Sequence, residues 1–486
     1  MAQVTTLRER RWLALAVAAA LAGGMPLFTT HAQDMGLDRQ AREAAWSGRV
    51  SEGLALIDRH LATHPDDREA RMDRARFLAW SGDYDQAIRA LDALGGDDDA
   101  MRTLRARIYA WAGWRDTALA INTPVYEADP TDYDAAFTQA LAARHGEWPQ
   151  ESLKALANVL AAKPEGKDTE DLVRAVRLPL FSSVGVPVSV YDDSDDIRIR
   201  SVGVDANLRL SDQWRLLGYA VEREHSAPAT GPFAPVTGGD SVDETRIGIG
   251  ARYAVSPHAA LEFSVGRSSL DPGDSDTIGH AAWTQRTSDQ FQYTLRAERD
   301  RMNASPRAVS LGVMRNRGML STEWRPTLDN LLRTSVALDD LNDGNRRIGA
   351  TADYRHAVHR SERINVDVGG QVEWFAYSED PGNGYYSPDH YTRVAPLVST
   401  YIKFNDDVGL YLQGAVGLQR DETFDGWKRA VDVGGELTVG IFTHWQLAAR
   451  AGYSERLNEF GAYEGTSVGL ELRYRFCEFR ADRCPP

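Results

Sequence analysis

This chain has few cysteines, no long internal apolar run and no excess of basic over acidic residues, and each shortage narrows the class of protein. The 486 residues include only two cysteines, Cys477 and Cys484, both in the tail. No internal apolar run reaches the ~18 residues that a membrane-spanning helix needs, and the mean hydropathy is -0.42, so a helical membrane protein is excluded. The net charge of -15 argues against a nucleic-acid partner, because phosphate binding needs a basic face. An acidic balance also fits solubility alone.

The N-terminus has the layout of an export signal. A cluster of arginines precedes the apolar run from Trp12 to Ala22, and Thr30 and Ala32 have the spacing of a signal-peptidase site. We therefore expect a secretory signal peptide over residues 1–32. A membrane anchor is the less favoured alternative, because the run is too short to span ~30 Å. Export would bring the chain into an oxidising compartment, where the two tail cysteines form a candidate disulfide.

Short strings recur through the first third of the chain. They are Trp46-Ser47-Gly48, Trp80-Ser81-Gly82 and Trp111-Ala112-Gly113, with a degenerate copy at Arg144-His145-Gly146. The glycines recur every 31 to 34 residues, which is the period of tetratricopeptide repeats. The residues with expected packing roles are Gly48, Gly82, Tyr84, Ala87 and Gly113. Each glycine ends the first helix of a pair, the tyrosine packs into the pair, and the alanine lets the second helix approach.

The chain thus resembles the tetratricopeptide repeat family over about residues 36–170. Such repeats form a solenoid whose concave surface docks another protein, and a helical spacer without a partner is the alternative. The tryptophans are expected in the core, because they recur at one repeat position.

The pattern changes near residue 178. In the segment "SVGLELRYRF", every second residue from Val468 to Phe476 is apolar, and the residues between are small or charged. Strict alternation predicts a strand with one apolar and one polar face. Similar segments between turn-rich breaks lead us to expect about sixteen strands, with roughly 18 residues for each strand and its connection, enough for a ~10-residue membrane strand.

The polar faces of these strands are too polar for a packed core, because burying unpaired charges costs several kcal/mol each. The apolar face must then be the outside, with lipid as its solvent. On this interpretation Leu470 and Tyr474 face the bilayer while Glu471 and Arg473 face water inside a barrel. A soluble β-sandwich or propeller is the alternative, but its inner faces would need more apolar residues.

The predicted fold class is α+β and multidomain: a short N-terminal α-solenoid of tetratricopeptide repeats followed by an antiparallel transmembrane β-barrel of about 16 strands. A barrel of this size holds an aqueous channel. With an export signal, it predicts the bacterial outer membrane, with both termini in the periplasm. The expected parts are a signal peptide (1–32), a periplasmic repeat domain of about four repeats (33–177), the barrel (178–476) and a periplasmic tail (477–486).

Candidate contact residues inside the lumen are carboxylates and aromatic side chains of the barrel. The carboxylates are Glu262, Asp367, Glu373, Asp432, Glu436 and Glu471, and the aromatic residues are Tyr385, Tyr386 and Trp427. Carboxylates would attract cationic cargo, and aromatic rings would stack on cargo with apolar faces. The alternatives are ion pairs across neighbouring strands, since arginines such as Arg246 and Arg252 share the polar face, and girdle or loop packing for the aromatic rings.

Periplasmic tetratricopeptide repeats followed by a sixteen-stranded barrel resemble the exopolysaccharide secretion porins, which export poly-β-1,6-N-acetylglucosamine or cellulose. The stretch "GNGYYSPDHYTRVAP" (382–396) is similar to a Tyr-Tyr-Ser/Asn-Pro element late in those barrels, and the block from Trp445 to Phe476 resembles their last hairpin. The chain departs from the family in having fewer repeats and in continuing past Phe476 as "CEFRADRCPP".

The resemblance implies an outer-membrane export porin for a biofilm exopolysaccharide. Poly-β-1,6-N-acetyl-D-glucosamine is the expected cargo, and the repeat domain would dock a periplasmic polymer-modifying deacetylase or the synthase complex. Cellulose export and a non-transporting adhesion or docking barrel are the alternatives. The histidines are scattered without nucleophile or metal spacing, so we expect no enzyme, no cofactor and no metal. An outer-membrane hydrolase is the disfavoured alternative.

Overall fold

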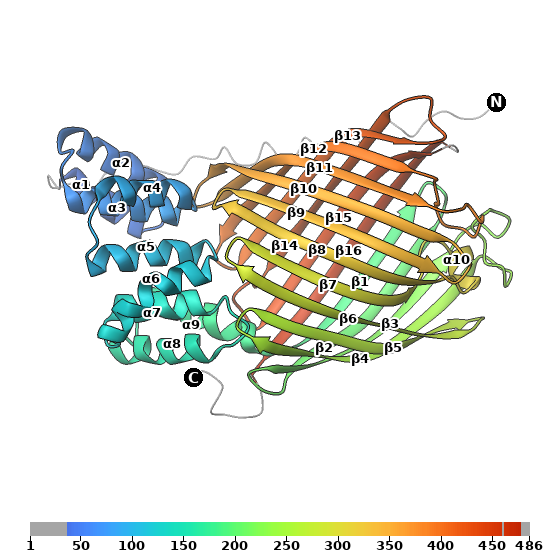
Figure 1. Cartoon of the computed structure of the whole chain (residues 1–486), viewed down its shortest axis with the longest axis horizontal. Coiled ribbons are helices and arrows are strands. Elements are labelled where there is room, and N and C mark those ends of the chain that lie inside the picture. Colours follow the sequence, from blue (N-terminus) through green and yellow to red (C-terminus); the bar gives the residue numbers. More distant parts are fainter. Residues whose placement is uncertain (1–35, 459–460, 478–486) are drawn as a thin grey trace, which may run out of the picture.

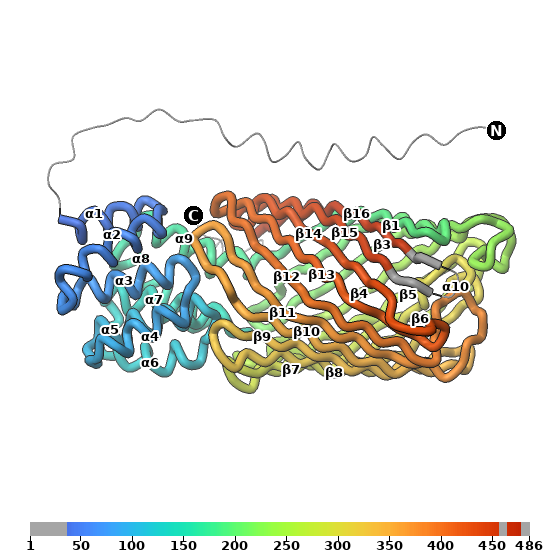
Figure 2. The backbone as a smooth tube through the Cα atoms, turned by 90° about the horizontal axis from the view of Figure 1, so that it is seen from above, coloured from blue at the N-terminus to red at the C-terminus, as the bar shows by residue number. Residues whose placement is uncertain are grey.

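The computed structural model describes residues 36–458 and 461–477. The predicted signal peptide and Cys484 lie outside these residues, so the signal and the Cys477–Cys484 disulfide stay predictions. Within them, a stack of helices lies against one end of a long barrel (Figure 1). The view from above shows the same two parts end to end (Figure 2). The predicted fold class, a helical repeat solenoid followed by a sixteen-stranded antiparallel barrel, is confirmed.

The repeat helices of the described residues form four antiparallel pairs followed by a ninth helix. They are α1 (Leu37–Trp46), α2 (Val50–Thr63), α3 (Arg68–Trp80), α4 (Tyr84–Leu94), α5 (Asp99–Trp111), α6 (Arg115–Ala128), α7 (Tyr133–Ala143), α8 (Gln150–Ala162) and α9 (Lys167–Arg177), and the 3-10 turn η1 (Leu178–Leu180) leads to the barrel. A further short helix, α10 (Pro306–Ser310), lies among the strands.

Aspartates and glycines set the ends of the repeat helices. Asp67, Asp83, Asp98 and Asp132 each accept a hydrogen bond from a backbone N–H three residues on, which satisfies one free donor at the start of the helix. Gly48, Gly82 and Gly113 follow the first helix of their pairs at φ of 85°, 86° and 82°. An L residue with a side chain rarely adopts this left-handed conformation, so glycine ends the helix here.

Small residues allow the paired helices to pack closely. Ala87 is fully buried beside Ala75 and Leu91, and Tyr84 packs at the edge of this cluster. Trp80 packs against Phe77, with ring centroids 5.6 Å apart, and Trp111 is partly buried at the junction of two clusters. The prediction that every repeat tryptophan lies in the core is wrong for Trp46, which is 68% exposed. It belongs to the first helix pair of the described residues.

Sixteen strands of the described chain form one closed antiparallel sheet. They are β1 (Ser182–Asp193), β2 (Arg198–Arg209), β3 (Trp214–Ser226), β4 (Ser241–Ser256), β5 (Ala259–Asp271), β6 (Ser275–Ser288), β7 (Phe291–Arg301), β8 (Met314–Thr327), β9 (Asn330–Leu341), β10 (Arg346–Arg360), β11 (Ile364–Tyr377), β12 (Tyr391–Asn405), β13 (Val408–Asp421), β14 (Lys428–Val439), β15 (Trp445–Asn458) and β16 (Gly461–Phe476). The barrel closes where β1 pairs with β16 from Ser182↔Phe476 onward. Closure leaves no unpaired strand edge, as a lipid environment requires.

The apolar residues of the strands point outward. Leu470, Leu472 and Tyr474 are among the exposed large apolar side chains. Exposed large apolar residues also occur at alternate positions along the other strands of the barrel. At the end next to the helices, Trp214 packs against Tyr253 and Trp445 against Tyr474, both with ring centroids 4.6 Å apart. Aromatic rings at this level are typical of the membrane–water interface. No helix of the described residues is long and apolar enough to cross a membrane.

The two ends of the barrel differ in the length of their connections. At the helical end the turns are short, as at residues 257–258 and 328–329. At the opposite end, three longer loops cover residues 227–240, 302–313 and 378–390. Outer-membrane barrels have short periplasmic turns and longer extracellular loops. The helices therefore lie on the periplasmic side.

Candidate functional site

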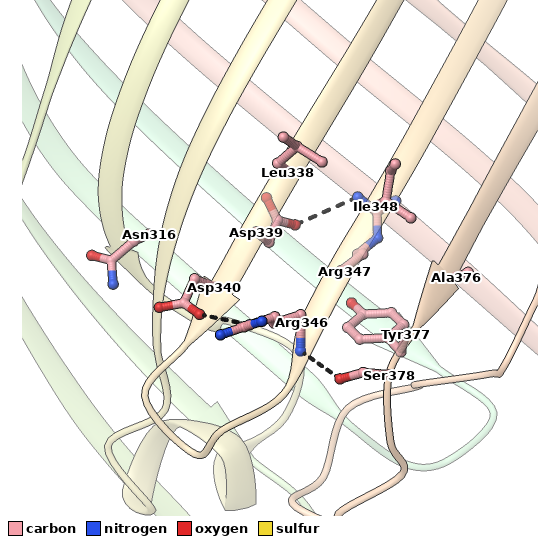
Figure 3. A pocket seen from close by; sticks show the side chains of 10 residues that line it. All are labelled: Asn316, Leu338, Asp339, Asp340, Arg346, Arg347, Ile348, Ala376, Tyr377 and Ser378. Atoms are coloured by element: carbon pink, nitrogen blue, oxygen red, sulfur yellow. Dashed lines mark hydrogen bonds and ion pairs between the residues drawn. The ribbon is translucent and has the colours of Figure 1, made fainter.

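The lumen wall consists of the residues between the outward apolar ones. Figure 3 shows this alternation at the loop end of β8–β11. Asp339 and Arg347 occupy inward-facing positions and pair at 3.5 Å. Their chain neighbours Asp340 and Arg346 occupy outward-facing positions and pair at 3.4 Å. Asp339 is also held by a bidentate hydrogen bond from Arg317 at 2.6 and 2.7 Å. The wall therefore carries charges that neighbouring strands satisfy.

Ion pairs of this kind include most of the predicted lumen carboxylates. Asp367 pairs with Arg360 and Glu436 with Arg450 on neighbouring strands, both at 2.5 Å. Asp432 pairs with Arg393 two strands away, and Glu471 pairs with Arg473 on its own strand at 2.7 Å and with Arg450 on the next at 3.3 Å. Glu262 lies within hydrogen-bond distance of His280 (3.0 Å). Glu373 lies opposite Arg393 in the register of β11 and β12. This arrangement favours the ion-pair alternative. Paired charges stiffen the wall and present a weaker net field to a charged polymer than isolated carboxylates would.

Three long loops, one of which contains α10, meet at the extracellular mouth. Ala308 and Val309 of α10 are fully buried. Val309 packs against Val242 and Leu270 from β4 and β5, and Ala308 packs near Leu341 of β9. These partners come from distant parts of the wall, so the helix lies across the inside of the mouth.

Hydrogen bonds join the other two loops to α10. Ser305 Oγ donates to Gly384 O at 2.6 Å, Arg307 N donates to Phe233 O at 3.0 Å, and Val236 N donates to Ser310 Oγ at 2.9 Å. The three loops thus form one interlocked plug. Sequence reasoning missed this plug, although Ser305-Pro306, an N-cap followed by proline at the first helical position, is a signature of a helix start.

The predicted aromatic contacts lie at this same mouth. Tyr385 is only 6% exposed, and its hydroxyl bonds with Asp343 and Asn345 inside the loop cluster. Tyr386 donates to Asp421 at 2.5 Å, and Trp427 immediately precedes β14 and is exposed. Burial of Tyr385 removes its ring from contact with a sugar, so loop packing, the alternative left open for this residue, fits the structure.

The periplasmic mouth is bordered by the helical repeats. Each helix pair lies against a barrel turn, and successive pairs lie against successive turns. The third pair also reaches the β4–β5 turn, where His258 Nε2 lies 2.7 Å from Asp116 Oδ1. In the first pair, Ser51 donates to Glu362 of the β10–β11 turn at 2.6 Å, and Leu328 of the β8–β9 turn packs on the α3–α4 cluster of the second pair. In the third pair, Asp116 N and Thr117 N donate to Asp289 of the β6–β7 turn at 2.9 and 2.7 Å. In the fourth pair, Glu147 N donates to Pro257 O of the β4–β5 turn at 2.9 Å.

Further contacts strengthen this docking. Trp148 Nε1 donates to Ala254 O at 3.0 Å, and Arg252 pairs with Glu147 at 2.6 Å. Lys167, at the start of α9, pairs with Asp406 of the β12–β13 turn at 3.1 Å. The pKa of Asp406 is lowered by hydrogen bonds from Lys403 and Lys167. The helical domain is therefore attached to the barrel at several points around the rim.

The described residues contain no group of three or more His, Cys, Asp or Glu side chains placed to hold a metal ion. The buried polar cluster at the loop end is an ion-pair network: Glu244 accepts from Ser268 at 2.6 Å, and Arg246 pairs with Asp300 at 2.7 Å. Among the described residues, Ser268 and His225 contact different oxygens of Glu244, and no hydrogen bond joins the serine hydroxyl to the imidazole. These side chains hold strands together.

Comparisons with known proteins agree with this architecture. The PgaA membrane β-barrel domain matches residues 209–406, and a tetratricopeptide repeat matches residues 47–108. Among solved structures, a "Bacterial polysaccharide outer membrane secretin" aligns with a TM-score of 0.52 and 16% identity, over 61% of this chain and 99% of that one. No curated protein sequence matches significantly.

Other outer-membrane barrels are more distant. CdiB from Acinetobacter baumannii aligns with a TM-score of 0.36 and 11% identity over 59% of this chain and 60% of that one, and OmpT of Vibrio cholerae with 0.32 and 12% over 61% and 96%. Over residues 209–406 the barrel is similar to the PgaA membrane β-barrel domain, and tetratricopeptide repeats precede it, which fits the arrangement expected of an exopolysaccharide export porin. The protein resides in the bacterial outer membrane, with its repeats in the periplasm.

Proposed function

We propose that this outer-membrane barrel, with its periplasmic repeats, exports a biofilm exopolysaccharide. One observation carries the proposal: a closed sixteen-stranded barrel whose inner wall is polar and charge-paired, with helical repeats fixed around its periplasmic mouth. A barrel of this size can hold a wet channel, and paired charges offer weak, repeated contacts without a tight trap. The fold likeness to a polysaccharide secretin supports the same cargo class.

Poly-β-1,6-N-acetyl-D-glucosamine is the cargo we favour, because the matched barrel profile and the Tyr385-Tyr386-Ser387-Pro388 stretch agree with that branch of the family. Cellulose is the second candidate. The repeat surfaces that do not touch the barrel would dock a periplasmic deacetylase or the synthase complex, since tetratricopeptide repeats bind other proteins. The protein acts as a conduit and catalyses no reaction in this proposal.

The test is secretion in cells that make the polymer. Cells lacking the protein should lose surface polysaccharide and accumulate it in the periplasm, and the full-length chain should restore secretion. Digestion of the restored polymer with a β-1,6-hexosaminidase or with a cellulase identifies the cargo. Unchanged surface polymer in the absence of the protein would favour the adhesion or docking barrel instead.

Deleting residues 36–170 tests the role of the repeats. The barrel should still assemble, as seen by its heat-modifiable migration, while secretion falls. Normal secretion by the barrel alone would remove the docking role and leave the conduit role intact.

A further inference from the structure

A cavity of about 310 Å³ lies between the third repeat and the barrel, at the periplasmic rim. The helical side contributes Trp111 and Trp114, and the barrel side contributes Phe291, Gln292, Glu323 and Arg325. We propose that this cavity is a saccharide-binding site at the entrance to the lumen, which takes one pyranose unit of the exported chain. The inference rests on the proposed function and adds a named binding site to it.

The position of the cavity suits a strand about to enter the barrel. Phe291 is the first residue of β7, and Arg325 lies two residues before the end of β8, so both are at the periplasmic edge. Gln292 of β7 and Glu323 of β8 lie opposite each other in the sheet, and both occupy inward-facing positions. The cavity therefore joins the repeat domain to the first polar residues of the lumen wall.

The chemistry of the lining matches a sugar. The C–H faces of a pyranose are apolar and pack on aromatic rings, while its hydroxyls need donors and acceptors. Among the residues that the structure describes, the indole N–H groups of Trp111 and Trp114 and the amide of Gln292 have no hydrogen-bond partner. Glu323 is held in place by Arg325 at 2.8 Å and Arg333 at 3.1 Å, which leaves a fixed carboxylate as an acceptor.

Trp114 breaks the pattern of the repeats at this point. The residue after the repeat glycine is Arg49, Asp83 or Glu147 in the other copies and tryptophan only here. Asp83 caps its own helix, whereas Trp114 occupies the cap position of α6 without a side-chain cap. Asp289 of the barrel supplies the missing acceptor. The indole thus replaces a local cap and lines the cavity instead, with Tyr109 stacked on it at 5.7 Å.

The charges of the cavity favour an uncharged sugar unit. Arg286 and Arg325 are balanced by Asp289 and Glu323. His145 is neutral at physiological pH, because burial and the nearby Arg144 lower its pKa to about 4. With no excess of either sign, the site should take N-acetylglucosamine or glucose units in preference to cationic glucosamine.

Binding of defined oligosaccharides to the full-length protein in detergent tests the site. The probes are a β-1,6-linked N-acetylglucosamine tetramer, its deacetylated form and cellotetraose, titrated calorimetrically. We expect the wild type to bind one of the two uncharged tetramers. Trp114→Ala should weaken this binding about tenfold or more, and Gln292→Ala several-fold. Gln292→Ala is the second variant because its side chain has no described partner, so folding should be unaffected.

Trp46→Ala is the matched control, since Trp46 belongs to the same repeat string but lies on the exposed first pair. It should bind as the wild type does. Wild-type affinity in both Trp114→Ala and Gln292→Ala, no binding of either uncharged tetramer, or preference for the deacetylated one would overturn the proposed site. None of these results affects secretion in the deletion test above, so the site can fail while the export function stands.

Discussion

His145 shows how one side chain of the fourth repeat depends on its burial. It sits in the turn after α7, and its ring lies 2.9 Å from Ala110 O of the preceding repeat. A neutral ring protonated on Nε2 donates this bond. Burial first, and then the charge of Arg144, lower the pKa of His145 from 6.5 to about 4. The folded state therefore resists protonation that the unfolded chain accepts.

The stability of the helical domain should fall as pH drops from about 6.5 to about 4 because of this residue. Above that range both states are neutral at His145, and within it only the unfolded state gains the proton. At 1.36 kcal/mol per unit of pKa difference, the loss approaches about 3 kcal/mol. Chemical unfolding of the full-length protein, followed by helical circular dichroism at pH 7 and pH 4, measures it.

His145→Gln is the comparison, because the amide can keep the bond to Ala110 without titrating. The variant should lose about 3 kcal/mol less than the wild type over the same pH range. Parallel losses in the two proteins would show that the ring is protonated in the folded state.

Predictions for single residues succeeded where the periodicity of the sequence alone determines which way a side chain faces. Alternation put Leu470 outward and Glu471 inward, and the structure agrees. The ionic partners of the carboxylates depend on strand register and on which strands become neighbours. Asp205 and Arg473, for example, are far apart in the chain and meet only because β1 closes the barrel between β2 and β16. No local pattern contains that information.

At the scale of elements, the most informative contact is the cap that the β6–β7 turn gives to α6. The Asp289 carboxylate accepts from Asp116 N and Thr117 N. Capping aspartates are worth about 0.5–2 kcal/mol. Asp289→Ala should therefore reduce protection of these two amides in hydrogen exchange by about tenfold, and it should loosen the third repeat from the rim.

Asp132→Ala is the control for that measurement. Asp132 caps α7 from within the helical domain, through Ala135 N at 2.7 Å. Its loss should affect exchange at the start of α7 and leave α6 protected. If α6 keeps full protection in Asp289→Ala, the cap across the two domains is absent in solution.

The α10 plug makes a second prediction at this scale. Replacing residues 303–312 with a flexible glycine–serine linker of equal length removes the packing of Val309 and the hydrogen bond from Ser305. Single-channel conductance in planar bilayers should rise several-fold, because the mouth of a sixteen-stranded barrel is otherwise wide enough for water and ions. Trp427→Ala, in a neighbouring loop, should conduct like the wild type. Equal conductance in all three proteins would mean that the pore is narrowest elsewhere.

Element-level prediction was uneven for a physical reason. Strands and repeat helices carry their own period, so their number and order could be read from the chain. Loops 227–240 and 378–390 have no period, and their conformation is set by contacts with α10 that exist only in the closed barrel.

At the scale of the whole molecule, the barrel turns its apolar side chains outward toward lipid and its polar side chains inward toward water. Leu470 lies near the middle of β16 and faces outward. An arginine at the bilayer midplane costs about 2–4 kcal/mol, but near the interface only about 0–1 kcal/mol. Leu470→Arg should therefore lower the urea midpoint of the barrel in lipid vesicles, whereas Leu210→Arg, in the turn that directly follows β2, should change it little.

A barrel that tolerates both substitutions equally would not be surrounded by hydrocarbon. The architecture itself could be predicted from the sequence, because an export signal, a repeat period and strand alternation each act over long stretches. The contact between the two domains could not, since it joins turns such as those at Asp116 and Asp289 that carry no shared pattern.

The docking of successive helix pairs on successive hairpin turns also limits how the chain can grow. Each added pair must take the next turn of the rim, and the described barrel offers only the turns between its sixteen strands. An array longer than half the circumference would begin to cover the opening. A homologue with many more repeats must therefore leave the rim and extend away from the membrane, which would separate the capture of cargo at a distance from its delivery to the pore.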